Sequence, residues 1–296
     1  MKLGLNIINY GPGTTSDELG DWARLAEDGG FDFAMISDHV AITPDVAELY
    51  PAPFWDPLTT LAWLAGRTAR IELGTTVLVV PFRHPIITAR MVANIDHFSG
   101  GRIILGVGLG WAEREYASVG VSYADRGAIM DEYLAALRTL WTTDVATFEG
   151  RHVSFADVQT GPRPARDPHP PIWVGGNTRR AMRRAVTLGD GWHPLRPEAG
   201  WLTQHGLPTL REVAERHDRP LPVVAPRLYL EITDAPLPEE GRLAGHGSID
   251  QIRHDVDELV TLGIERVVFD TDKVTPQDRA AHEAHWRTYE TLIERV

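Results

Sequence analysis

Apolar and polar residues along this chain switch repeatedly between a two-residue spacing and a helical spacing. Leu3–Ile8 alternates as a strand does, and the residues after it place apolar side chains three and four positions apart. Thr15 and Glu18 have the spacing of a capping box at the start of that helix. Gly29-Gly30 ends the helix, and the apolar segment Phe31–Ser37 follows as the next strand.

The same unit recurs along the chain, so that eight predicted strands each lead into a helix. The strands are Leu3–Ile8, Phe31–Ser37, Ile71–Val80, Arg102–Val107, Pro171–Val174, Gly191-Trp192, Val223–Ile232 and Arg266–Asp270. The helices are Thr15–Ala26, Asp56–Ala69, Pro85–Phe98, Asp125–Trp141, Thr178–Leu188, Thr209–Arg216, Ser248–Leu262 and one from Pro276. Helical crossovers join parallel strands, so the pattern predicts one α/β domain over residues 1–296, a (β/α)₈ TIM barrel.

An open, doubly wound sheet is the alternative architecture. It would normally carry a glycine-rich turn after the first strand, with backbone amides free to bind a ligand. Here Pro12 stands inside the corresponding turn, Asn9–Gly13. The sequence therefore favours the barrel.

Two segments break the alternation and are predicted to be insertions after strands four and seven. The first, Thr142–Pro170, contains a possible hairpin turn at Phe148–His152 and then a proline-rich run. The second, Asp234–Gly247, is polar and rich in Pro and Gly. Because neither has a core pattern of its own, we expect both to shape the substrate pocket of the barrel.

Composition narrows the possible partners and chemistry. With 29 Lys and Arg against 41 Asp and Glu, the formal net charge is −12, which argues against nucleic acid and anionic membranes as partners. The chain has no Cys, which excludes a thiol nucleophile, a disulfide and a thiolate metal site, and no H-x-H or H-E-x-x-H motif supports a metal. The first residues resemble a strand instead of a signal peptide, so we expect a cytoplasmic protein.

The candidate site residues lie where strands end, because a (β/α)₈ barrel carries its active site at the carboxyl ends of its strands. Strand two ends in Ser37-Asp38-His39, where His39 could shuttle a proton; a helix cap beside a surface histidine is the alternative. Strand four ends in Gly106–Trp111, whose alternating glycines suit either the close approach of a flat ring or a tight turn.

Further candidates follow strands five to seven. Gly175-Gly176-Asn177-Thr178 opens a helix beside Arg179-Arg180, which suits a phosphate, although an ordinary helix cap has the same form. His193 ends strand six and is expected to face the pocket. One face of strand seven is polar and carries Arg227, Tyr229 and Glu231. These side chains either contact the substrate or have a structural role inside the barrel.

Taken together, these motifs resemble the luciferase-like monooxygenase superfamily, in its branch of F420-dependent oxidoreductases. The matching segments are Ile36–His39, Leu73–Leu78, Arg83–Pro85, Ala93–Arg102, Leu105–Trp111, Pro170–Asn177 and Leu188–Trp192. They cover most of the chain outside the two insertions. The motifs are specific for the superfamily and less specific for the cofactor.

The resemblance implies roles for particular residues. Asp38 and His39 would lie against the ring of the cofactor, which is coenzyme F420 or, alternatively, FMN. A non-prolyl cis peptide would fall at Thr76–Val77, behind that ring. The remaining cofactor contacts implied are Gly108, Leu109, Gly110 and Trp111 along the cofactor side chain, and Gly175, Gly176, Asn177 and Thr178 at its phosphate. A homodimer is also implied.

One departure from the family pattern bears on the substrate. Deazaflavin-dependent sugar-phosphate dehydrogenases have a glutamate as proton donor where this chain has Trp111, which argues against a sugar phosphate. Glu113 and Glu115 follow on an expected helix and are predicted to point elsewhere. We therefore take His39 as the catalytic proton donor, with His193 as the second candidate.

Three functions remain open on this basis. The first is hydride transfer between a deazaflavin and a small organic substrate; the second is an FMNH2-dependent flavin monooxygenase; the third is a non-catalytic flavin-binding protein. A deazaflavin carries an acidic oligoglutamate tail, so a basic rim at Arg83, Arg179 and Arg180 would favour the first. A pocket sealed by the Thr142–Pro170 insertion would favour the third.

Overall fold

Parallel strands form the centre of the molecule. The computed structural model describes residues 1–271 and 275–296. Its main sheet is built from β1 (Lys2–Ile7), β2 (Phe33–Ile36), β3 (Glu72–Thr75), β5 (Ile103–Gly108), β8 (Ile172–Gly175), β9 (Gly191–His193), β10 (Val223–Val224), β11 (Arg227–Tyr229) and β14 (Arg266–Asp270). The hydrogen-bonded order is β10-β9-β8-β5-β3-β2-β1-β14-β11, with the short β4 (Leu78–Val79) paired to β5.

This sheet closes into a barrel through one broken strand. β10 pairs with β9, and β11 pairs with β14, yet only Ala225 and Pro226 separate β10 from β11 in the chain. The Ala225 amide donates to the Trp192 carbonyl at 2.9 Å, and the Val268 amide donates to the Pro226 carbonyl at 2.9 Å. The two ends of the sheet are therefore halves of a single strand, and the predicted (β/α)₈ barrel is confirmed.

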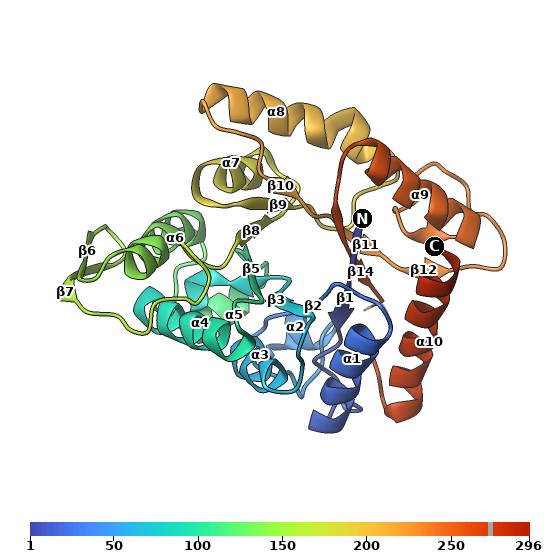
Figure 1. The fold of residues 1–296 in the computed structure, drawn as a ribbon, viewed down its shortest axis with the longest axis horizontal. Helices are drawn as coiled ribbons and strands as arrows, with labels where there is room; N and C mark the ends of the chain where they lie inside the picture. Colours follow the sequence, from blue (N-terminus) through green and yellow to red (C-terminus); the bar gives the residue numbers. More distant parts are fainter. Residues whose placement is uncertain (272–274) are drawn as a thin grey trace.

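Helices surround the sheet and supply its crossovers (Figure 1). They are α1 (Ser16–Asp28), α3 (Pro57–Ala65), α4 (Pro85–Ser99), α6 (Arg126–Thr142), α7 (Arg179–Leu188), α8 (Leu207–Arg216), α9 (Ile249–Thr261) and α10 (Arg279–Arg295), with the short α2 (Pro44–Ala47) and α5 (Glu113–Ser118). Thr15 and Glu18 form both halves of the predicted capping box. Pro57 and Pro85 each open a helix at a position where no amide donor is needed.

The prediction that the first insertion, residues 142–170, shapes the substrate pocket is wrong. Residues 142–170 contain a hairpin, β6 (Ala146–Glu149) and β7 (Ser154–Val158), which packs against the outside of α6 (Figure 1). The amide of Arg166 then donates to Asp96 at the end of α4, and its side chain lies 3.5 Å from Glu72 at the start of β3. The segment follows a helix instead of a strand, so it runs along the amino ends of the strands and cannot seal the predicted pocket.

The second insertion, residues 234–247, lies at the end of the barrel where a segment that shapes the pocket is expected. Residues 234–247 connect a strand to α9, and the short strands β12 (Glu231–Ile232) and β13 (His246–Gly247) pair within this region. The Ala199 amide donates to the Arg242 carbonyl, joining the insertion to the loop after β9. This places the insertion at the carboxyl ends of β9 and β11.

Aliphatic and aromatic side chains of strands and helices form the core between the two layers. Trp22, Tyr289, Leu5 and Phe269 are among the fully buried ones. Across the residues that the structure describes, no helix is both long enough and apolar enough to cross a lipid bilayer.

Candidate functional site

Asp38 at the end of β2 is held in a bidentate ion pair. Its side chain is fully buried, and the two terminal nitrogens of Arg83 donate to its two oxygens at 2.6 and 2.8 Å. The Val79 amide donates to the same carboxylate, and Arg83 also donates to Asp56 at 2.8 Å. Burial raises the pKa of Asp38, and the Arg83 contact opposes that rise. Asp38 therefore anchors the loop after β3, and its predicted contact with a cofactor ring stays a prediction.

His39, the next residue, is paired with a carboxylate from a distant helix. The Nδ1 atom of His39 lies 2.7 Å from Oε2 of Glu115 on α5, and both side chains are buried. The other oxygen of Glu115 accepts hydrogen bonds from the backbone amides of Val40 and Ala41, at 2.5 and 3.1 Å. The expectation that Glu115 points elsewhere is therefore wrong, while Glu113 is exposed as expected.

Aromatic rings surround the imidazole of His39. Tyr50 stacks on it with ring centroids 5.2 Å apart, and Phe54 and Trp111 meet it edge-on at 5.4 and 6.0 Å. Trp111 is 44% exposed, so this aromatic cage opens to solvent on its side. Among residues 1–271 and 275–296, nothing hydrogen-bonds the Nε2 atom of His39. Within this part of the chain, Nδ1 is therefore the imidazole nitrogen that is hydrogen-bonded.

The predicted cis peptide at Thr76–Val77 is present, and it lies between β3 and β4. Val77 packs against two glycines of neighbouring strands, because a Cβ on Gly108 would lie 2.3 Å from the Val77 side chain and one on Gly175 would lie 2.8 Å from it. These two glycines are thus required by the packing of the barrel wall. Gly110 has a left-handed φ of 66°, and Leu109 accepts a hydrogen bond from Tyr116 through its carbonyl.

His193 lies inside the barrel with both ring nitrogens occupied. Nδ1 donates to the Ala225 carbonyl at 2.5 Å, so Nε2 accepts from the Thr76 hydroxyl at 2.9 Å. Burial, the largest cause, lowers the pKa of His193 to about 4. The side chain is neutral near pH 7 and fully buried, so this geometry does not favour His193 as the proton donor.

A buried polar network that the sequence did not predict lies beside His193. Arg227 donates to the Thr76 carbonyl at 2.6 Å and contacts Asp270 at 2.6 Å, and Arg196 contacts the same carboxylate at 2.7 Å. Asn6 donates to Asp270 at 3.1 Å. Arg227 is therefore bound to the wall that carries the cis peptide, which supports a structural role.

The loop from Gly175 to Thr178 has the features of a phosphate site. Gly176 has a φ of 118°, which side chains rarely adopt, and a Cβ there would lie only 3.2 Å from the Ala181 Cβ, so the loop requires glycine at this position. Thr178 caps the Ala181 amide, whereas the amides of Arg179 and Arg180 have no acceptor within α7. The Asn177 side chain is tied to the backbone of Leu195 at 2.7 Å. The Gly176 amide already donates to the His193 carbonyl at 3.1 Å. The amides of Arg179 and Arg180, and not the Asn177 side chain, are therefore the groups that would hold an anion here.

The predicted basic rim is not continuous. Arg83 lies in the Asp38–Asp56 cluster and contributes no free charge, whereas Arg179 and Arg180 are exposed at the start of α7. Of these two, Arg179 pairs with Glu212 on α8 at 2.8 Å. The positive charge is therefore on the α7 side of the phosphate loop only.

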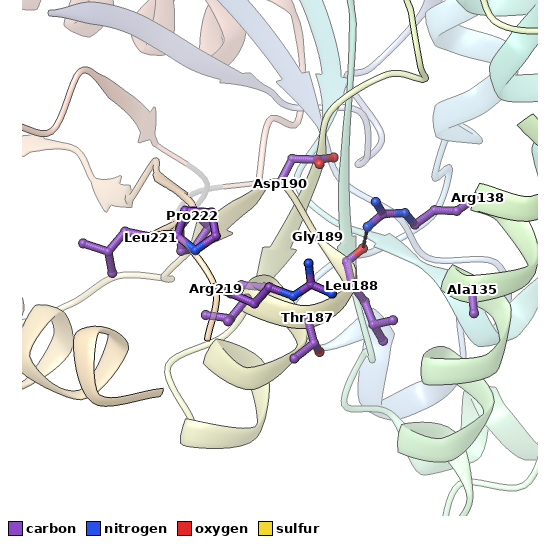
Figure 2. Close-up of a pocket in the computed structure, with 12 residues that line it drawn as sticks. Ala135, Arg138, Thr187, Leu188, Gly189, Asp190, Arg219, Leu221 and Pro222 are labelled. Atoms are coloured by element: carbon purple, nitrogen blue, oxygen red, sulfur yellow. Dashed lines mark hydrogen bonds between the residues drawn. The ribbon is translucent and has the colours of Figure 1, made fainter. Parts of the chain in front are cut away.

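A cavity of about 580 Å³ lies at the opposite end of the barrel (Figure 2). Arg138, Asp190, Arg219 and Pro222 line it, and Arg138 donates to the Leu188 carbonyl at 3.1 Å. Asp190 and Pro222 precede β9 and β10, so the cavity faces the amino ends of the strands. It is separate from the residues around His39.

Comparison with known proteins agrees with this arrangement. A family model described as luciferase-like monooxygenase matches residues 5–240. The chain belongs to this family. The monooxygenase RslO1 from Streptomyces bottropensis superposes with a TM-score of 0.83 at 22% identity, covering 100% of this chain and 98% of that one, which shows the shared fold.

Two curated relatives of this luciferase-like chain differ in their cofactor. An F420-dependent glucose-6-phosphate dehydrogenase of Kineococcus radiotolerans is 33% identical over 226 residues, 74% of this chain and 64% of the relative. An FMNH2-dependent dimethylsulfone monooxygenase of Pseudomonas putida is 30% identical over 175 residues, 58% of this chain and 46% of the relative. The chain is thus an oxidoreductase of the luciferase-like family, and these relatives leave its cofactor open.

Proposed function

We propose that this chain is an F420-dependent oxidoreductase that transfers a hydride between the deazaflavin and a small organic substrate. The His39–Glu115 pair is the observation that carries the proposal, because hydride transfer at a carbon bearing oxygen or nitrogen needs a partner that takes up or releases a proton. The longer match to the F420-dependent dehydrogenase also supports it.

The chain's own residues divide the chemistry as follows. When bound, the deazaflavin supplies or accepts the hydride. The Nε2 atom of His39 takes the proton from the substrate heteroatom or returns it. Glu115 accepts from Nδ1, which fixes the tautomer of His39, and its negative charge stabilises the imidazolium that forms. A substrate and a cofactor held together at the carboxyl ends of the strands would react without the entropic cost of meeting in solution.

The residues around the site also fit the cofactor and favour one kind of substrate. The amides at the start of α7 would hold the phosphate, and Val77 would lie behind the ring. Tyr50, Phe54 and Trp111 present aromatic surface around His39, and the neighbouring Arg83 is paired with two carboxylates. This surrounding suits an uncharged organic substrate better than a sugar phosphate.

Titration of the purified protein with coenzyme F420 and with FMN, followed by fluorescence, tests the proposal. We expect saturable binding of F420 and weaker binding of FMN. Preference for FMN, with oxygen consumption once the flavin is reduced, would replace the proposal with the monooxygenase function of the Pseudomonas putida relative. F420 binding without turnover of any substrate in a screen of alcohols, aldehydes and imines would favour the binding protein.

A further inference from the structure

A groove between α7 and α8 collects basic side chains on the surface. Its volume is about 370 Å³, and Arg179, Arg180, Arg183, Val213, Arg216 and His217 line it. Five of these six side chains are basic, in a chain whose formal net charge is −12. Such a concentration of one sign against the overall charge marks a place where an anion is attracted.

Carboxylates neutralise only part of this charge. Glu212 pairs with Arg179 and Arg216, each at 2.8 Å. Asp131 pairs with Arg183 at 2.7 Å and also with the neighbouring Arg184. In the described part of the chain, Arg180 is exposed and has no carboxylate partner. The arginines of the groove therefore outnumber the acids that face them.

The groove also begins where the phosphate loop ends. Arg179 and Arg180 directly follow Thr178, and their amides are the ones left without an acceptor inside α7. A ligand whose phosphate lies at Gly176–Thr178 could therefore continue along the first turn of α7 into the groove. The continuing part would have to be acidic and flexible.

We propose that this groove binds the oligocarboxylate tail of the deazaflavin cofactor. The inference rests on the proposed function, since F420 extends beyond its phosphate through a chain of glutamates whereas FMN ends at the phosphate. Exposed arginines bind carboxylates through paired N–H donors and can exchange partners along such a chain. The groove would then contribute to the choice of cofactor.

The test compares two forms of the cofactor on charge-reversal variants. The variant Arg180→Glu with Arg216→Glu changes two exposed side chains of the groove; Arg24→Glu with Arg287→Glu makes the same charge change at exposed positions of α1 and α10. Dissociation constants are measured by fluorescence for F420 with its glutamate tail and for the form that ends before the glutamates. We expect the groove variant to lose about tenfold in affinity for the tailed form, with little change for the other form and in the control. High salt should remove the advantage of the tail.

A fluorescein-labelled penta-γ-glutamate peptide separates failure of this inference from failure of the proposed function. If the wild-type protein binds both deazaflavins equally and the groove variant is unchanged, the groove proposal is overturned while the cofactor assignment stands. If neither deazaflavin binds, the proposed function fails. In that case, peptide binding that the groove variant loses would keep the groove as an oligocarboxylate site, and absence of peptide binding would overturn it.

Discussion

His39 and Glu115 are 76 residues apart in the chain, yet His39 Nδ1 lies 2.7 Å from Glu115 Oε2. The carboxylate is held by two further hydrogen bonds, from the amides of Val40 and Ala41. It therefore cannot move away from the imidazole without losing three contacts. This geometry orients the Nε2 atom and makes Glu115 a positioning residue for His39.

Replacing either member of this pair should lower turnover more than cofactor affinity. We expect His39→Ala to reduce kcat by about 10² to 10⁴, the usual contribution of a general acid or base. Glu115→Gln should reduce it within the same range, by about 10² to 10⁴, since the amide of Gln presents N–H to Nδ1 and stabilises the wrong tautomer. Steady-state kinetics and a fluorescence titration of the cofactor check both variants.

Glu113→Gln is the matched control, because Glu113 is an exposed carboxylate on the same helix. It should have wild-type kcat. Unaltered turnover in Glu115→Gln, with the fold intact by circular dichroism, would remove the pair from the proposed mechanism.

Gly176→Asp should weaken cofactor binding strongly by bringing a carboxylate against the phosphate. Because φ at Gly176 is 118°, any side chain there strains the backbone, and Gly176→Ala measures that part alone. We expect Gly176→Asp to bind at least about tenfold more weakly than Gly176→Ala. Equal dissociation constants for the two folded variants would contradict the assignment of the phosphate to this loop.

Arg83 and Asp38 should contribute unequally to stability. Arg83→Met leaves the fully buried Asp38 carboxylate with only the Val79 amide, whereas Asp38→Asn leaves Arg83 paired with Asp56. We expect Arg83→Met to lower the free energy of unfolding by about 3–5 kcal/mol, and Asp38→Asn by less. The double variant should recover part of the loss, which urea unfolding of all four proteins measures as a coupling energy. Additive losses would show that the pair is not coupled.

The pKa of His193 predicts acid sensitivity. Burial lowers that pKa from 6.5 to about 4 in the folded protein, so the unfolded chain binds the proton first. The stabilisation from the neutral, buried imidazole is present above pH 6.5 and is lost as the pH falls toward 4, by ~3 kcal/mol in all. His193→Gln should show a smaller loss of stability over this range, and the exposed His254→Gln should match the wild type. Equal slopes of unfolding free energy against pH in all three proteins would show that His193 does not cause the acid sensitivity.

Much of the fold could be predicted from local patterns. The spacing of apolar residues, the Thr15 capping box and the glycines after helices gave the order of strands and helices, because each depends on neighbours within a few positions. The order of elements also explains why the predicted pocket-shaping role of residues 142–170 is wrong. These residues follow a helix, α6, and therefore lie at the amino ends of the strands. The resemblance at Leu73–Leu78 also located the cis peptide.

Contacts in the candidate site between residues far apart in the chain could not be predicted from the sequence, and only the tertiary structure shows them. The sequence singled out Asp38, His39 and Gly176 because strand ends and helix starts are local features. It did not reveal that Asp38 is bound to Arg83, that Glu115 reaches His39, or that Arg227 and Asp270 meet beside Thr76. Barrel closure brings these side chains together, and a buried polar group takes whichever partner that closure places within hydrogen-bonding distance. The sequence by itself thus determined which strand ends and helix starts carry candidate site residues. The closed barrel decided which of these side chains contact one another.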